Sequence, residues 1–142
     1  MKDLHSNIKC VRALSPVASG DDTALVSEIL DRAGFESAEL VIQTGSIGDA
    51  NVTFAVLIED GELSNLGDNG AVADAQLLGT EAGAAFDYDD DNKVIKIGYL
   101  GNKRYLRATI TPTGNSATAP AYVSAVWIMG SPRKAPQSTQ II

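Results

Sequence analysis

Apolar and polar residues alternate with a period of two along most of the chain. Residues Asn51 to Glu59 place every second side chain on an apolar side, namely Val52, Phe54, Val56 and Ile58. Ala38 to Thr44 alternates in the same way, and so does Ile8 to Leu14, with Cys10 on its apolar side. This period is typical of strands that bury one face. Turn-forming residues separate the segments, so the pattern predicts an antiparallel β-sandwich or barrel.

The segment from Val94 to Thr111 has the clearest pattern. Gly101-Asn102 is a two-residue turn signal, and a hairpin closed there places Ile97 opposite Leu106. One face then collects Ile95, Ile97, Tyr99, Leu106, Ala108 and Ile110. The other face is cationic and carries our candidate contact residues Lys96, Lys103, Tyr105 and Arg107, with the tyrosine ring expected over Gly98. Such a face suits either contact with an acidic surface or simple solvation.

Tyr122 to Met129 is apolar on both sides and holds the only tryptophan. A strand of this kind is either central in a sandwich or covered by a neighbouring subunit. We expect Val123, Trp127 and Met129 to contribute to a subunit contact, with Ala125 beside them. Burial of Trp127 within its own core would contradict that hypothesis.

Other segments are less clearly patterned. Residues 22–34 fit a capped amphipathic helix by propensity, but the surrounding β pattern favours a strand. Asp60-Gly61 predicts a turn into a strand at Leu63 to Leu66, and Gln76 to Leu78 predicts a further short strand. We therefore expect one domain of about eight strands, with the sandwich at 8–130, an N-terminal arm at 1–7 and a C-terminal arm at 131–142.

Charge narrows the classes of partner. The chain has 142 residues, a net charge of −7 and a pI near 4.5, so nucleic acid is not an expected partner. Residues 1–92 contain all 18 acidic side chains, whereas every charged side chain in residues 93–142 is basic. The halves could form a dipolar surface, but interleaved strands would cancel the asymmetry, and we favour cancellation. No apolar run is long enough for a membrane span, and the N-terminus lacks a secretory signal pattern, so we expect synthesis in a cytoplasm.

The sequence shows no catalytic, cofactor or metal motif, and we expect a protein that is not an enzyme. Cys10 is the single cysteine and lies on an apolar side, so we expect a thiol in the core. Asp87, Asp89 and Asp91 match the first ligand positions of a calcium loop. However, Asn92 and Gly98 occupy the positions that need glycine and glutamate, so a solvated acidic turn is the better interpretation.

Three sequence blocks carry a resemblance to a family: DRAGFES at 31–37, LLGTE at 77–81 and IGYLGNKRY at 97–105. Together the blocks resemble small virion proteins of tailed bacteriophages, encoded beside the major capsid protein. The resemblance covers residues 7–130 and implies a jelly-roll decoration, or cement, protein on the outer capsid surface. It implies the major capsid protein and further copies of the chain as partners, at two-fold or three-fold axes.

Two alternatives remain open from the sequence. One is a head-tail joining or tail structural protein, which would form closed rings. The other is a glycan-binding sandwich, for which Tyr99, Tyr105 and Trp127 are the candidate stacking residues. The alternation directs Tyr99 and Trp127 inward, which weighs against this second alternative.

Overall fold

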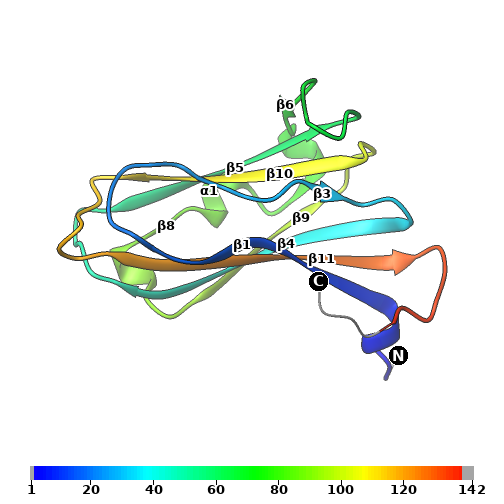
Figure 1. Ribbon diagram of the computed structural model, residues 1–142, viewed down its shortest axis with the longest axis horizontal. Helices are drawn as coiled ribbons and strands as arrows, with labels where there is room; N and C mark the ends of the chain where they lie inside the picture. Colours follow the sequence, from blue (N-terminus) through cyan, green and yellow to red (C-terminus); the bar gives the residue numbers. More distant parts are fainter. Residues whose placement is uncertain (1, 139–142) are drawn as a thin grey trace.

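The computed structural model describes residues 2–138, which fold as two antiparallel β-sheets packed face to face (Figure 1). The five-stranded sheet has the order β1-β11-β4-β9-β7, with bounds Ile8–Ser19, Ala121–Pro132, Phe35–Ile47, Val94–Tyr99 and Leu77–Leu78. The six-stranded sheet has the order β2-β10-β5-β6, with bounds Leu25–Val26, Tyr105–Thr113, Thr53–Gly61 and Gly70–Ala71. Its other strands are β3 (Leu30–Asp31), which pairs with β10, and β8 (Phe86–Asp87), which pairs with β5.

The chain passes from one sheet to the other at almost every connection. β1, β4, β9 and β11 belong to the five-stranded sheet, while β2, β3, β5 and β10 belong to the six-stranded sheet. Long strands that alternate between two sheets in this order form a jelly roll. The predicted all-β, jelly-roll-like sandwich is therefore confirmed.

The predicted hairpin at Gly101-Asn102 is wrong. β9 pairs with β4, where Ile97 lies opposite Leu40, and β10 pairs with β5, where Leu106 lies opposite Asp60. The connection therefore crosses between sheets instead of joining neighbouring strands. The inward alternation is nevertheless correct, because Ile97 and Leu106 are both buried, each from its own sheet. Two facing strands bury the same residues as two paired strands, so the period of two does not distinguish them.

The hydrophobic core fills the space between the sheets. β4 and β5 contribute alternate residues to it, as the pattern predicted for Ala38 to Thr44 and Asn51 to Glu59. Its largest fully buried members include Leu30, Leu40, Ile42, Phe54, Ile58, Ile97, Leu106, Ile110 and Trp127. The rings of Phe54 and Phe86 stack with their centroids 4.5 Å apart, which joins β8 to the core.

The expectation of a core thiol is wrong, because Cys10 is exposed. β1 shifts register against β11 between Arg12 and Leu14 and again between Leu14 and Val17. A bulge reverses which alternate residues face inward. Ala13 is therefore buried, whereas Cys10 lies opposite Ile128 on the outer face of the sheet.

Residues 22–34 form neither the helix nor one continuous strand. They run along β10 as two short strands, β2 and β3, separated by Ser27 to Ile29. The strand predicted at Leu63 to Leu66 is also absent, because the Asp68 carboxylate accepts hydrogen bonds from the Glu62 and Leu63 N–H groups and closes a loop there. The short strand predicted at Gln76 to Leu78 is present as β7 at Leu77–Leu78, while Gln76 ends a short 3₁₀ helix.

Short helices and the chain ends complete the fold. The helix α1 (Glu81–Ala84) contacts β5 and β9, and Glu81 accepts a hydrogen bond from the Ile58 N–H at 2.7 Å. The 3₁₀ helices are η1 (His5–Asn7), η2 (Asp74–Gln76) and η3 (Tyr88–Asp90). At the C-terminal side, the Gln137 N–H donates to the Ser6 carbonyl, so 133–138 return to η1. Residues 139–142 of the predicted C-terminal arm lie outside the described residues.

Candidate functional site

The cationic residues predicted to share one face lie on different parts of the molecule. Lys96 lies on the outer face of the five-stranded sheet, whereas Tyr105 and Arg107 lie on the outer face of the six-stranded sheet. Lys103 belongs to the connection between the sheets. Because β9 and β10 are not paired, the predicted single cationic patch does not exist. Leu78, rather than Tyr105, covers Gly98, with its Cβ 3.0 Å from the position that a glycine Cβ would occupy.

The expected subunit-contact residues of β11 are interior residues. Val123, Trp127 and Met129 all face the core, and Trp127 is only 1% exposed, which contradicts the contact hypothesis. The Trp127 indole N–H has no hydrogen-bond partner among the described residues. This side chain therefore stabilises the core by packing alone. The other side of β11, with Tyr122 and Val126, is the exposed one.

The outer face of the six-stranded sheet has a polar end and an uncharged middle. At the polar end, Arg107 pairs with Glu59 at 2.7 Å, and the Arg104 guanidinium lies 5.1 Å from the centre of the Tyr105 ring. Beyond these pairs, three strands present a strip of exposed or half-buried residues without charge. We call it the threonine strip: Val26, Thr53, Ala55, Leu57, Thr109 and Thr111.

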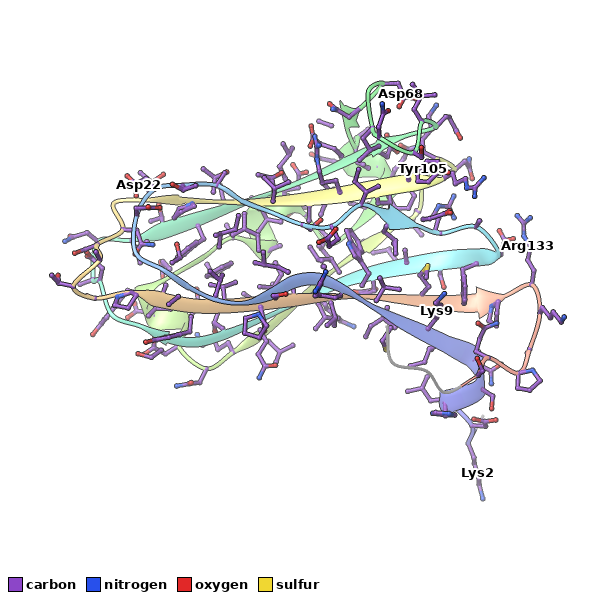
Figure 2. The ribbon with its side chains drawn as sticks, in the orientation of Figure 1. Lys2, Lys9, Asp22, Asp68, Tyr105 and Arg133 are labelled. Carbon is purple, nitrogen blue, oxygen red and sulfur yellow. The ribbon has the colours of Figure 1, made fainter. Side chains whose placement is uncertain are left out.

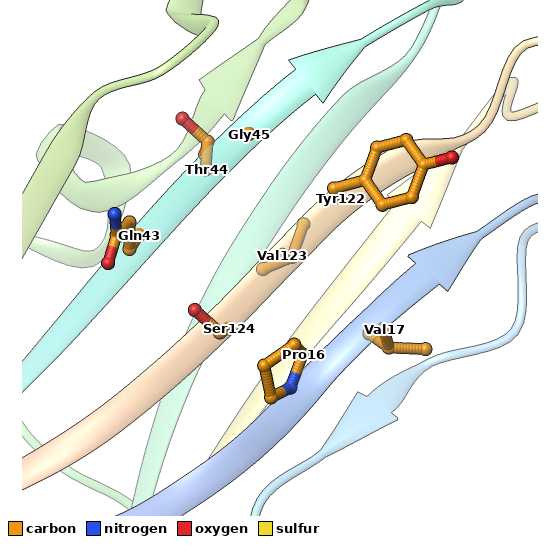
Figure 3. A pocket seen from close by; sticks show the side chains of 8 residues that line it. All are labelled: Pro16, Val17, Gln43, Thr44, Gly45, Tyr122, Val123 and Ser124. Carbon is orange, nitrogen blue, oxygen red and sulfur yellow. The ribbon is translucent and has the colours of Figure 1, made fainter.

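A groove crosses the outer face of the five-stranded sheet (Figure 3). It has a volume of about 330 Å³ and lies where the bulged part of β1 passes β11 and β4. Its lining residues are Pro16, Val17, Gln43, Thr44, Gly45, Tyr122, Val123 and Ser124. The Tyr122 side chain is half exposed, and its ring is seen face on above the strands.

Three polar side chains of this groove form no hydrogen bond within the described chain, whereas the Thr44 hydroxyl donates to the Asp90 carbonyl at 2.6 Å. The side chains of Gln43, Ser124 and Tyr122 form no hydrogen bond with any other residue in the described range. Gly45 lies beside the start of the Tyr122 side chain, and a Cβ at Gly45 would meet the Tyr122 Cβ at 3.1 Å. The glycine therefore lets the tyrosine lie close to β4.

The acidic turn that resembled a calcium loop uses its carboxylates locally. Asp87 caps η3, and Asp91 accepts a hydrogen bond from the Ile47 N–H at 2.7 Å. A hydrogen bond from Lys93 holds the pKa of Asp90 below its ordinary value. Within residues 2–138, no group of three or more His, Cys, Asp or Glu side chains is placed to hold a metal ion. The turn is a structural element joining η3 to β4.

Ionic pairs at the opposite end of the sandwich also connect separate segments. Arg104 donates two hydrogen bonds of 2.9 Å to the Asp31 carboxylate, and these lower the pKa of Asp31. Arg32 donates to the carbonyl oxygens of Gly101 and Lys103. These arginines are occupied in holding the 101–104 connection against β3, so they do not form an open anion site.

The groove residues Tyr122 and Gln43 were missed in the sequence. A signal existed in part, since Tyr122 alternates with Val123 and Trp127 and must face away from them. Nothing in the sequence showed that a bulge in β1 would leave space beside it.

Among residues 2–138, no helix has the length and apolar character required to cross a bilayer.

No protein-family model matches this chain, and no curated protein matches it. Among solved structures, it is similar to the SPBc2 prophage-derived protein YomS, with a TM-score of 0.49 and 9% identity over 88% of this chain and 94% of that chain. It is also similar to the CBM36-1 domain of a multidomain xylanase from the hindgut metagenome of Trinervitermes trinervoides (TM-score 0.44, 9% identity, 88% and 98% coverage).

A third similar structure is the N-terminal cellulose-binding domain of β-1,4-glucanase C from Cellulomonas fimi (TM-score 0.44, 13% identity, 91% and 82% coverage). Likeness at this level does not transfer a function from one protein to another.

Proposed function

We propose that this protein is a non-enzymatic virion protein that binds the outside of an assembled phage capsid and cements neighbouring capsid subunits. The threonine strip on the six-stranded sheet is the proposed contact surface. The observation that carries the proposal is this uncharged strip on a chain with a net charge of −7. Interface cores are depleted of charged residues, and the strip carries none among its exposed and half-buried side chains.

The virion-protein resemblance supports the proposal, and the three blocks that carry it contact one another in the folded chain. Arg32 of the first block donates to the carbonyl oxygens of Gly101 and Lys103 in the third. Leu77 and Leu78 of the second block pair with Tyr99 and Gly98 of the third. The blocks therefore build one structural unit at one end of the sandwich. Contacts of this kind indicate that the three blocks stabilise the fold.

Tyr105 and Arg107 remain candidate contact residues at the polar end of the strip. Tyrosine and arginine are enriched in protein interfaces, and both residues lie beside the uncharged middle of the face. Lys96 points from the opposite sheet and is no longer part of this surface. Copies bound at two-fold or three-fold positions of a shell would each gain from the high local concentration of neighbouring sites.

The proposal is tested by co-sedimentation of purified protein with expanded and unexpanded shells. The wild-type chain is expected to sediment with assembled shells. Leu57→Lys and Thr109→Lys place a charge in the strip, and burial of an unpaired charged or polar group weakens binding by roughly tenfold or more. Val126→Lys is the matched control, because Val126 is 40% exposed, close to the 36% of Leu57, but lies on the opposite sheet.

Failure of the wild-type chain to sediment with either form of shell would falsify the proposal. Loss of binding in Val126→Lys with retention in Leu57→Lys would place the contact on the other face. Protein found at a single vertex of the particle would instead favour a head-tail joining role.

A further inference from the structure

We propose that the groove on the five-stranded sheet binds a neutral oligosaccharide. This site is separate from the threonine strip and adds a function to capsid adhesion. The residues that carry the proposal are Tyr122, Gln43 and Ser124, with Pro16 and Gly45 shaping the groove.

The shape of the groove follows from the irregularity of β1. Register shifts on both sides of Leu14 displace the strand from regular pairing with β11. Pro16 lies within this displaced part and has no N–H to donate, so it keeps the chain from returning to regular pairing at that point. The space beside it, bordered by Gln43 and Ser124, opens on the outer face of the sheet (Figure 3).

The ring of Tyr122 supplies a flat apolar surface. It is half exposed and is seen face on in Figure 3, where it points away from Gly45. The C–H groups on one face of a pyranose ring can pack on such a surface. No described element covers this ring, in contrast to Tyr99, which is buried, and Tyr105, which has Arg104 above it.

Polar groups beside the ring match the hydroxyl groups of a sugar. The Gln43 amide offers both donors and an acceptor, and the Ser124 hydroxyl offers both functions as well. Neither side chain has a hydrogen-bond partner in the described part of the chain. Small-molecule sites combine an apolar surface with a few polar groups in this way.

The lining of the groove also indicates that the ligand is uncharged. It favours a sugar over an apolar peptide segment. None of its eight lining residues is ionisable at neutral pH, so a charged sugar would gain no ion pair there. An apolar side chain from another protein would bury the polar groups of Gln43 and Ser124 without giving them a hydrogen-bond partner, which weakens binding. A neutral sugar needs no ion pair, and its hydroxyl groups can form hydrogen bonds with Gln43 and Ser124.

The experiment is a glycan array of neutral and acidic oligosaccharides probed with the full chain, followed by calorimetric titration of the best neutral ligand. We expect binding to neutral oligosaccharides that persists at high salt. Tyr122→Ala is expected to reduce affinity about tenfold, since it removes the aromatic surface. Tyr122→Phe keeps the ring and is expected to retain most of the affinity, while Gln43→Ala should weaken binding through lost hydrogen bonds.

Leu63→Ala is the control, because Leu63 is exposed in the loop after β5 and lies outside the groove. Circular dichroism of each variant establishes that it folds. Three results would overturn the proposal: no neutral oligosaccharide binds, binding is confined to charged glycans, or Tyr122→Ala and Gln43→Ala both bind as the wild-type chain does. None of these results bears on shell binding, which is measured separately.

Discussion

Tyr99 shows how a single side chain joins the two sheets. Its hydroxyl donates a 2.6 Å hydrogen bond to Asp60 of β5 and accepts one of 3.1 Å from the Lys103 N–H. The ring is buried, and a Cβ at Gly101 would overlap it. The glycine that suggested a hairpin turn is therefore needed for close approach of the backbone to Tyr99. Its conformational role is different from the one that the sequence indicated.

Burial, together with the hydrogen bond to Asp60, raises the pKa of Tyr99 above its ordinary value of 10.0. The unfolded chain loses this phenolic proton near pH 10, whereas the folded chain keeps it, so stability should be full below that pH and fall above it. Tyr99→Phe should remove this part of the alkaline dependence and cost about 1 kcal/mol at neutral pH.

Urea unfolding between about pH 8 and pH 11 measures this dependence. Tyr88→Phe is the control, since Tyr88 is an exposed tyrosine outside the core. An alkaline profile that is the same in Tyr99→Phe and in the wild-type chain would contradict the assignment.

At the scale of elements, Ser27 takes the place of strand pairing between β2 and β3. Its N–H donates to the Ala108 carbonyl at 2.8 Å, and its hydroxyl accepts from the Ala108 N–H at 2.9 Å. Ser27→Ala leaves that buried N–H without a partner, so the free energy of unfolding should fall by about 1–3 kcal/mol. Chemical denaturation measures the change. Ser15→Ala, at an exposed position of β1, should stay near the wild-type value, and equal losses in both variants would argue against this role.

The positions of the long strands could be predicted from the sequence, but their pairing could not. The period of two reports which side of a strand is buried, and it identified the inward residues of β4, β5, β9 and β10. It does not show whether the next strand along the chain pairs with it in the same sheet or lies in the other sheet, across the core. Tyr122 to Met129 illustrates the limit, because its sequence fitted both a central strand and a strand covered by another subunit. In the structure Trp127 lies in the core, while Tyr122 is exposed on the other side of the strand.

The candidate site was harder to predict for a related reason. Tyr122, Gln43 and Pro16 come from three strands that are distant in the sequence. Only the sheet order β1-β11-β4 brings them together. The bulge that opens the groove depends on how β1 pairs with β11, and a loosely alternating segment does not specify that register.

At the scale of the molecule, the uneven charge along the sequence is largely cancelled by the topology, as we expected. The ion pairs Lys103–Glu62, Arg104–Asp31, Arg107–Glu59 and Arg133–Glu36 each join the basic C-terminal part to the acidic N-terminal part. Acidic side chains lie at both ends of the sandwich, since Asp22 lies at one end and Asp68 lies at the other, near Tyr105 and Arg133 (Figure 2). The two broad faces, with the strip and the groove, lie between these ends.

Placement of the strip and the groove on opposite sheets leads to the last prediction. If the strip faces the shell, the groove faces outward, so a decorated shell should hold many oligosaccharide sites at once and bind with high avidity. Shells decorated with the wild-type chain should be retained on an immobilised neutral oligosaccharide identified by the array, while bare shells should pass through. The Tyr122→Ala variant should still sediment with shells, but shells decorated with it should not be retained on the immobilised oligosaccharide. Shell binding that blocks oligosaccharide binding would show instead that both partners use the same face.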